Sequence, residues 1–204
     1  MFGLAYILAF GAYLLISIGV VRWVIRYARE SSRSAKRWGW GAALLMYSLV
    51  FWDWLPTVAT HQYYCAKESG FWVYKTLDQW KAENPGVMET LVNNKDAPSW
   101  QERYGDGHGI IDTYILNKRF NWIVRKEDLS RFLPIIRTEQ VVKDALKNEV
   151  LARYVDFGAG NSVKNTVGPP GPLKFWLHSG HCSGGESNDG HMWQFTKYFK
   201  GSEK

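Results

Sequence analysis

The chain has 204 residues, a formal net charge of +6, 46% hydrophobic residues and two cysteines, which is enough length for one or two domains. The positive charge is unevenly distributed, because residues 61–204 carry 19 basic against 17 acidic side chains and most of the excess lies within residues 22–37. A nucleic-acid-binding domain would need a basic surface of its own. We therefore expect no nucleic-acid partner and interpret the charge as a signal for membrane topology and anionic lipids.

Two long apolar segments begin the chain. Residues 2–21 carry no charge, and residues 38–60 carry only Asp53. A membrane-spanning helix needs about 20 predominantly apolar residues, so both segments are long enough. A signal peptide would instead begin with basic residues and have a shorter apolar core. We predict a two-helix transmembrane hairpin over residues 1–60, with Asp53 as a carboxylate near water at the outer membrane surface.

The loop between the two segments determines the predicted orientation. It contains one acidic residue, Glu30, and six basic residues, namely Arg22, Arg26, Arg29, Arg33, Lys36 and Arg37. Basic residues that flank membrane spans remain in the cytoplasm. We therefore place residues 22–37 in the cytoplasm, and both termini and residues 61–204 outside it.

Tryptophan residues lie at both ends of the predicted hairpin. Their amphipathic rings favour the headgroup level of a bilayer. The predicted membrane-interface residues are Trp23, Trp38, Trp40, Trp52 and Trp54. The lipid bilayer is thus the first expected partner.

Beyond the membrane, short elements of both kinds are expected. Pro56 should end or bend the second apolar helix, and residues 57–66 are expected to continue as a helical stalk. Residues 71–76 favour a strand because they are rich in aromatic and β-branched residues. Thr76 is a predicted N-cap of a short helix that Pro85–Gly86 ends.

The later chain favours strands. Residues 93–109 are polar and expected to be irregular, whereas residues 110–116 and 120–126 are predicted strands. Residues 135–157 fit either a helix, over about 138–157, or a hairpin with a turn at Lys147–Asn148, and we favour the hairpin. The Gly-rich stretches 158–172 and 180–190 are expected to be loops, with a short strand at 174–179 between them. Residues 61–204 are therefore predicted to form an α+β domain with a mainly antiparallel sheet.

Cys65 and Cys182 are the only cysteines in the chain. Both fall on the predicted outer side of the membrane, where disulfides persist. We predict a structural disulfide between them. Closing so long a loop stabilises the folded state by about 4–5 kcal/mol in the chain-entropy model.

Histidines near Cys182 allow an alternative, a metal site. Its candidate ligands are His178, His181, Cys182 and His191. Zinc and copper accept such ligands, and His61 precedes Cys65 by four residues, which places both on one helix face. The spacing matches no established metal motif. We therefore expect no metal and no cofactor, and we keep this set as the alternative.

Two short motifs suggest catalysis only weakly. In HCSGG at 181–185, His181 is a poor base for Cys182 because adjacent side chains usually point apart, and Ser183 has no evident base. GDGHG at 105–109 precedes a predicted strand, whereas a phosphate-binding loop precedes a helix. Turn formation is the better explanation for GDGHG, and we expect no catalytic residue.

Several segments resemble a group of uncharacterised bacterial inner-membrane proteins. They are WDWLPT at 52–57, YYC at 63–65, GFWVYKT at 70–76, QW at 79–80, NPGV at 84–87, LARYVDF at 151–157 and FWLHS…HC at 175–182. The resemblance covers about half of the chain. It implies a bacterial inner membrane and a periplasmic domain, and it transfers no activity.

These observations favour a non-enzymatic function. The chain has no coherent acid–base set, and Ala5, Ala9 and Ala12 have the small-residue spacing that lets membrane helices pack closely. We expect a membrane-anchored interaction protein or accessory subunit of a larger envelope assembly, with other membrane or periplasmic proteins as partners. The alternative is an envelope metal-binding protein or enzyme centred on His178, His181 and His191.

Overall fold

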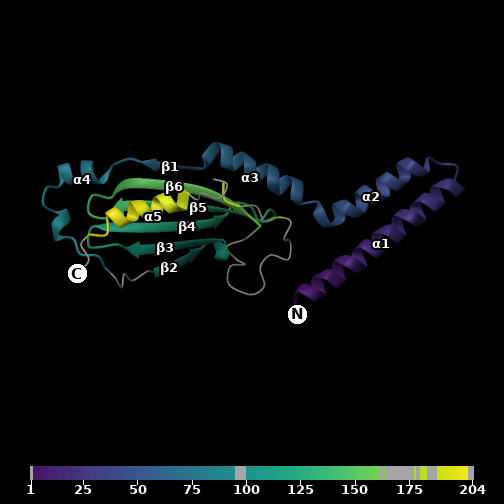
Figure 1. The fold of residues 1–204 in the computed structure, drawn as a ribbon, viewed down its shortest axis with the longest axis horizontal. Coiled ribbons are helices and arrows are strands. Elements are labelled where there is room, and N and C mark those ends of the chain that lie inside the picture. The colour runs from purple at the N-terminus through teal and green to yellow at the C-terminus, as the bar shows by residue number, and fades with distance from the viewer. Residues whose placement is uncertain are drawn as a thin grey trace. The chain divides into compact units, whose positions relative to one another are not determined.

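The computed structural model describes residues 2–94, 100–160, 163, 177, 180–182 and 188–201, and of residues 2–6, 188, 189 and 191 only the backbone. The chain forms two compact units, Met1–Leu55 and Pro56–Lys204, drawn in Figure 1. We call them the helix unit and the sheet unit. The boundary lies at 55/56, where the sequence predicted 60/61.

The helix unit consists of α1 (Phe2–Glu30) and α2 (Ala35–Phe51), joined by a short turn. The two helices pack against each other along part of their lengths. The Tyr13 hydroxyl contacts the carbonyl of Met46. Nearer the turn, a Cβ atom on Gly39 would lie 2.9 Å from Cγ1 of Ile25. The absence of a side chain at Gly39 therefore permits the close approach of α2 to α1.

The second apolar segment, residues 38–60, is not one continuous helix, and Pro56 was expected to end or bend it. It breaks at Trp52–Asp53, and α3 (Trp54–Glu68) begins at the next residue. The cause is Pro56, because a proline ring clashes with the carbonyl four residues earlier, here that of Trp52. Within α3, Pro56 is the third residue, where its missing N–H is not needed.

The break also changes the interpretation of two other features. Asp53 is only 1% exposed, so its description as a carboxylate near water is wrong, because the chain turns there instead of continuing as a helix.

Among the described residues, the segment Ile7–Glu30 is long and apolar enough to cross a membrane as a single helix. The helix α2 meets that criterion only together with α3, across the break.

The sheet unit contains one six-stranded antiparallel sheet with the order β1-β6-β5-β4-β3-β2. The predicted α+β class is therefore confirmed. The strands are β1 (Gly70–Val73), β2 (Trp100–Tyr104), β3 (Gly109–Ile115), β4 (Phe120–Asp128), β5 (Ile135–Asp144) and β6 (Glu149–Ala159).

The hairpin favoured for residues 135–157 is present as β5 and β6, and the turn contains Asn148 at φ 59°. Two elements were missed. Strand β2 lies within the stretch expected to be irregular, since its sequence WQERY lacks an alternating apolar pattern and four of its residues are exposed. Helix α5 (Asn188–Tyr198) begins inside a predicted loop. The strand predicted at 174–179 lies outside the described residues except for Leu177, which is in a short helical turn.

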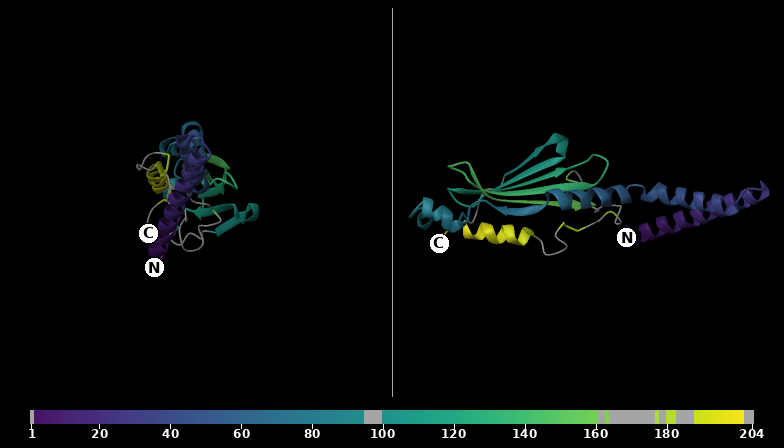
Figure 2. Two further views of the ribbon diagram at one scale, coloured as in Figure 1. Left: turned by 90° about the vertical axis from the view of Figure 1, so that its right-hand side faces the viewer. Right: turned by 90° about the horizontal axis from the view of Figure 1, so that it is seen from above.

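The hydrophobic core lies between one face of the sheet and the helices α4 (Leu77–Glu83) and α5, and Figure 2 shows α5 along this face. The rings of Trp80 and Phe120 meet edge to face with centroids 4.8 Å apart, and those of Phe120 and Phe199 at 4.9 Å. Such pairs contribute about 0.5–1.5 kcal/mol beyond their buried area. The predicted N-cap Thr76 is confirmed, with a complete capping box to Gln79.

A buried carboxylate joins α4 to the β5–β6 hairpin. Asp144, at the end of β5, accepts hydrogen bonds from Trp80 Nε1 at 3.0 Å and Arg119 Nε at 2.8 Å. It also accepts from the backbone N–H groups of Leu146 and Lys147. Burial alone would raise the pKa of Asp144, but the hydrogen bonds from Trp80, Arg119 and Lys147 outweigh it and lower the pKa below its ordinary value.

Candidate functional site

The predicted bond between Cys65 and Cys182 is present in the structure. The two residues are 117 positions apart in sequence, and their Cα atoms lie 5.1 Å apart. Helix α3 carries Cys65, and His61 lies four residues earlier on the same helix face. The bond therefore joins the chain that follows β6 to the helix that precedes β1.

His61 occupies a position beside the edge of the sheet. Strand β1 pairs with β6 only up to Val155, and no strand among the described residues pairs with Asp156–Ala159 on that side. There His61, which is 8% exposed, places Nε2 3.0 Å from the carbonyl oxygen of Phe157. The ring of Tyr64 stacks on that of Phe157 at 5.2 Å. A side chain on α3 thus satisfies a backbone group that a neighbouring strand would otherwise bond.

Asp156 holds the segment around Cys182 in place. Its carboxylate is almost fully buried and accepts a hydrogen bond from the Cys182 backbone N–H at 3.0 Å. The other carboxylate oxygen contacts Nδ1 of His181, whose side chain is 65% exposed. Hydrogen bonding offsets the cost of burying the carboxylate. The disulfide and Asp156 together fix the position of this segment.

A second aspartate–histidine pair has the same form. Nδ1 of His108 lies 2.9 Å from the buried Oδ2 of Asp128, and Oδ1 of Asp128 accepts from the backbone N–H of Val163 at 2.7 Å. Asp128 pairs with Ile136, and Ile136 with Gly158. Because side chains alternate along β6, Asp128 and Asp156 lie on the same face of the sheet. Each carboxylate thus binds a backbone N–H of the chain between β6 and α5.

Sequence reasoning missed both pairs. Asp156 stands between Val155 and Phe157 in an apolar part of β6, and a carboxylate in such a strand is rarely buried without a partner, which is a signal that sequence can give. Asp128 follows Arg125, Lys126 and Glu127, so its sequence gives no such signal. Their partners cannot be read from spacing, because the Cys182 N–H is 26 residues from Asp156 and the Val163 N–H is 35 residues from Asp128.

The catalytic hypotheses gain no support from this geometry. In the disulfide, Cys182 has no thiol that could act as a nucleophile, and Ser183 lies outside the described residues. The GDGHG motif forms the tight turn between β2 and β3, with Gly105, Asp106 and Gly107 all at positive φ. A strand follows this turn, as expected for turn chemistry and not for a phosphate-binding loop.

The metal hypothesis takes a different form from the predicted one. His61, Cys65 and Cys182 each offer a ligand atom, and these atoms all lie within 4.8 Å of one another. Of the predicted set, His178 lies outside the described residues, and only the backbone of His191 is described, on α5. The structure therefore brings Cys182 together with His61, and the grouping of His178, His181 and His191 stays a prediction.

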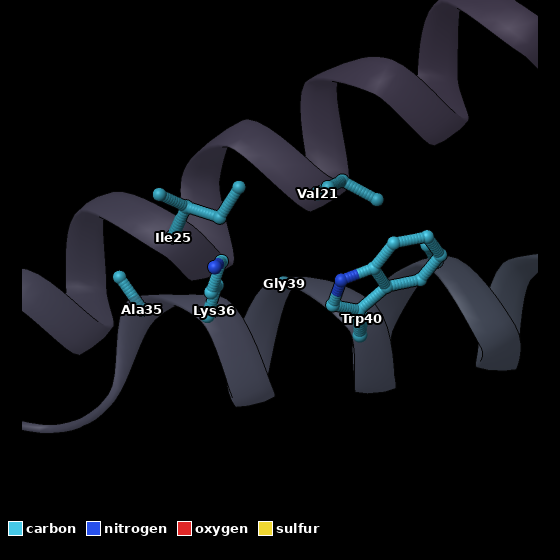
Figure 3. A pocket seen from close by; sticks show the side chains of 7 residues that line it. Val21, Ile25, Ala35, Lys36, Gly39 and Trp40 are labelled. Atoms are coloured by element: carbon cyan, nitrogen blue, oxygen red, sulfur yellow. The ribbon is translucent and has the colours of Figure 1, made fainter.

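The residues predicted for topology and membrane contact gather in and next to the helix unit. The basic residues lie in the last turns of α1, in the connecting turn and at the start of α2. Trp23, Trp38, Trp40, Trp52 and Trp54 are all exposed. Beside the Gly39–Ile25 contact, the helices form a shallow groove of about 300 Å³, with Val21 and Ile25 on one side and Lys36 and Trp40 on the other (Figure 3).

No protein-family model, curated protein or solved structure matches this chain. No known activity can therefore be carried over to its residues from a match. The chemistry that its own geometry offers is a disulfide, a buried imidazole beside it, and two imidazoles paired with buried carboxylates.

Proposed function

We propose that the protein is a membrane-anchored accessory component of a bacterial envelope assembly, with the sheet unit as a non-catalytic interaction domain in the periplasm. The observation that carries this proposal is the surface of the helix unit. Large apolar side chains are exposed on both helices, among them Ile7 and Leu15 on α1 and Leu44 and Leu49 on α2, with exposed fractions from 63% to 73%. Extended apolar patches of this kind are rare on soluble monomers and mark interaction or membrane surfaces.

A bilayer suits the dimensions of this unit. Helix α1 is long enough to span it, and the 17 residues of α2 rise about 26 Å at 1.5 Å per residue, close to the ~30 Å hydrocarbon core. We infer a hairpin of two spans whose connecting turn is cytoplasmic, since its flanks carry six basic residues against one acid. The chain that leaves α2 then emerges on the periplasmic side.

The disulfide supports the same orientation. Disulfides persist in the periplasm and are rare in the cytosol, and the sheet unit carries the Cys65–Cys182 bond. The resemblance of WDWLPT, GFWVYKT and LARYVDF to bacterial inner-membrane proteins agrees with a location in that membrane.

An aromatic surface on the sheet unit favours a protein partner. Trp72, on the edge strand β1, and Tyr74, just after it, are exposed. The guanidinium of Arg153, on the neighbouring strand β6, lies 5.9 Å from the centre of the Trp72 ring. Trp, Tyr and Arg are the residues most enriched in the energetic centres of protein interfaces. We call Trp72, Tyr74 and Arg153 the aromatic edge and propose that the partner contacts it.

Crosslinking in intact cells tests this function. A photo-reactive amino acid at position 72 should give a discrete protein adduct in the membrane fraction, whereas the same group at Lys118, an exposed turn residue, should not. Replacing both Trp72 and Tyr74 by Ala should reduce co-purification of that same adduct partner at least tenfold, as expected for a hot spot of about 2 kcal/mol. Identical adducts from both positions, or none from position 72, would count against the proposal.

A further inference from the structure

The disulfide lies next to an imidazole that neither the bond nor the edge of the sheet fully uses. We propose that, when the Cys65–Cys182 bond is reduced, His61, Cys65 and Cys182 bind a thiophilic metal ion such as Zn²⁺. The bond and the metal ion are then two alternative ways to join α3 to the segment that carries Cys182. This inference does not depend on the proposed membrane location or partner.

The ligand atoms are already close to the spacing that a metal requires. With Zn–S of about 2.3 Å and Zn–N of about 2.0 Å, tetrahedral ligand atoms lie about 3.4–3.8 Å apart. Cys65 Sγ is 3.9 Å from Nδ1 of His61 and 3.5 Å from Nε2. The two sulfur atoms, 2.01 Å apart in the disulfide, must separate to about 3.8 Å. Rotation of partly exposed cysteine side chains about Cα–Cβ provides this movement without a shift of the backbone.

The orientation of His61 is the one that a metal ligand needs. Its Nε2 lies 3.0 Å from the Phe157 carbonyl, and a carbonyl only accepts, so Nε2 carries the proton and Nδ1 the lone pair. Metal-binding histidines usually donate their second N–H to a carbonyl or carboxylate in this way. Bonding to the sheet edge requires Nε2 alone, and a disulfide requires no imidazole. Neither role uses Nδ1, which lies 3.9 Å from Sγ of Cys65, whereas Nε2 lies 3.5 Å from it. Rotation of the freed Cys65 thiol, which the metal site already requires, must therefore bring the sulfur towards the Nδ1 side of the ring.

The second thiol stays near the site after reduction. The Cys182 backbone N–H donates to the buried carboxylate of Asp156 at 3.0 Å, and this hydrogen bond does not involve the sulfur. Cys65 is held by α3, which also carries His61. Both thiols thus remain beside His61 when the covalent bond is gone, and water can occupy a fourth coordination position because both cysteines are partly exposed.

The chemistry balances if a dithiol protein acts as the reductant. Thiol–disulfide exchange oxidises that dithiol to a disulfide and converts Cys65–Cys182 into two thiols, with transfer of two electrons and two protons. Zn²⁺ then binds the two thiolates and Nδ1 of His61, and the two thiol protons pass to solvent. Exchange in the opposite direction, with a disulfide-bearing protein as the two-electron oxidant, re-forms the Cys65–Cys182 bond, leaves that protein as a dithiol and releases the ion.

Metal titration of the full-length protein in detergent tests the proposal. The protein is reduced with a phosphine, freed of reductant without oxygen, and titrated with Zn²⁺ against a chromophoric chelator and separately with Co²⁺. Reduced wild-type protein should bind one equivalent and show thiolate-to-cobalt charge-transfer absorption. Oxidised protein should bind none at this site.

Two histidine variants and a fold measurement make the result decisive. His61→Gln keeps a donor for the Phe157 carbonyl but lacks the imidazole, and it should lose at least tenfold in affinity. His108→Ala, which removes an imidazole outside the cluster, should bind as wild type does. Equal binding by His61→Gln would overturn the proposal. So would a reduced protein that stays folded by circular dichroism without binding, or one that unfolds and is not refolded by Zn²⁺.

Discussion

The helix unit and the sheet unit use apolar side chains in opposite ways. In the sheet unit, Trp80, Phe120 and Phe199 are fully buried against one another between sheet and helices. In the helix unit, large apolar side chains point outward, and the helices approach each other at Gly39, which has no side chain, and at the Tyr13–Met46 contact. A chain in water must cover its own apolar surface, whereas one in a bilayer is covered by lipid. The contrast is the one expected if the two units fold against different solvents, as the proposed membrane anchor requires.

The two units also differ in how distant segments are joined. In the sheet unit, Asp128, Asp144 and Asp156 each bind backbone N–H groups, and a disulfide joins positions 117 residues apart. Ordering long connections costs conformational entropy, and these interactions offset it. The helices of the other unit are adjacent in sequence and need only a short turn.

The largest expected effect concerns the orientation of the helix unit. An alkaline phosphatase fused after Lys204 should be active, because that enzyme folds only outside the cytoplasm. Replacing Arg33, Lys36 and Arg37 by Glu should reduce its activity strongly, since in the proposed topology these are half of the basic residues that keep the turn in the cytoplasm. The matched control replaces Lys143, Lys147 and Lys197 of the sheet unit by Glu. If the alkaline phosphatase were inactive and a reporter that works only in the cytoplasm were active after Lys204, the proposed topology would be wrong. The helix unit would then not be a hairpin that folds in the bilayer with residues 61–204 outside the cytoplasm.

Loss of the disulfide should be the largest stability effect in the sheet unit. Cys65→Ser or Cys182→Ser should lower the free energy of unfolding by about 4 kcal/mol, and the double variant should be no worse than either single variant. Thermal denaturation measures the loss, and proteolysis within residues 158–190 should increase. The prediction requires that both cysteines resist alkylation without reductant. Two freely alkylated thiols in folded protein extracted from the envelope would show that the bond is absent.

Asp144→Ala should cost about 3 kcal/mol, because Arg119 and the Trp80 N–H are left in a largely buried site without their acceptor. Denaturant unfolding of the full chain measures this loss. Glu102→Ala removes an exposed carboxylate on the edge strand β2 and should change stability by about 0.5 kcal/mol at most. Equal effects of the two changes would show that the Asp144 cluster does not join α4 to the hairpin.

The same aspartate should make stability depend on pH. Its pKa is lowered in the folded protein, so its contribution is present above the pKa of the unfolded chain and is lost as pH falls through the folded value. Wild-type protein should therefore lose more stability on acidification than Asp144→Asn, which has no proton to bind there. Parallel pH–stability curves for the two proteins would contradict the lowered pKa.

Short-range sequence patterns correctly predicted the elements that depend on residues close together in the chain. The capping box at Thr76 and the hairpin turn near Asn148 follow from residue types a few positions apart, and both are present. Strand β2 could not be recognised in this way, because an exposed edge strand has no apolar alternation. Its presence depends on pairing with β3, which no pattern within β2 reports.

The candidate site was predictable only in its covalent part. With two cysteines and an expected oxidising compartment, Cys65 and Cys182 had no other partner. The positions of His61, Asp156 and Phe157 depend on where α3 meets β6, beyond the first residue of β1. That contact is set by the residue at which β1 begins, Gly70, which pairs with Val155, and a sequence pattern does not fix such a boundary to the residue.

The smallest predicted effect concerns the start of α4, which depends on residues close together in the chain. Thr76→Ala removes the hydroxyl that accepts the Gln79 N–H at 3.3 Å and one half of the capping box, and it should cost about 1 kcal/mol in unfolding free energy. Thr76→Ser keeps the acceptor oxygen and should retain most of that stability. Thr90→Ala, also an exposed threonine in a short helical turn, serves as the control and should be nearly neutral. If Thr76→Ser lost as much as Thr76→Ala, the methyl group and not the cap would hold α4. The start of that helix would then depend on tertiary packing, as the edges of the sheet do.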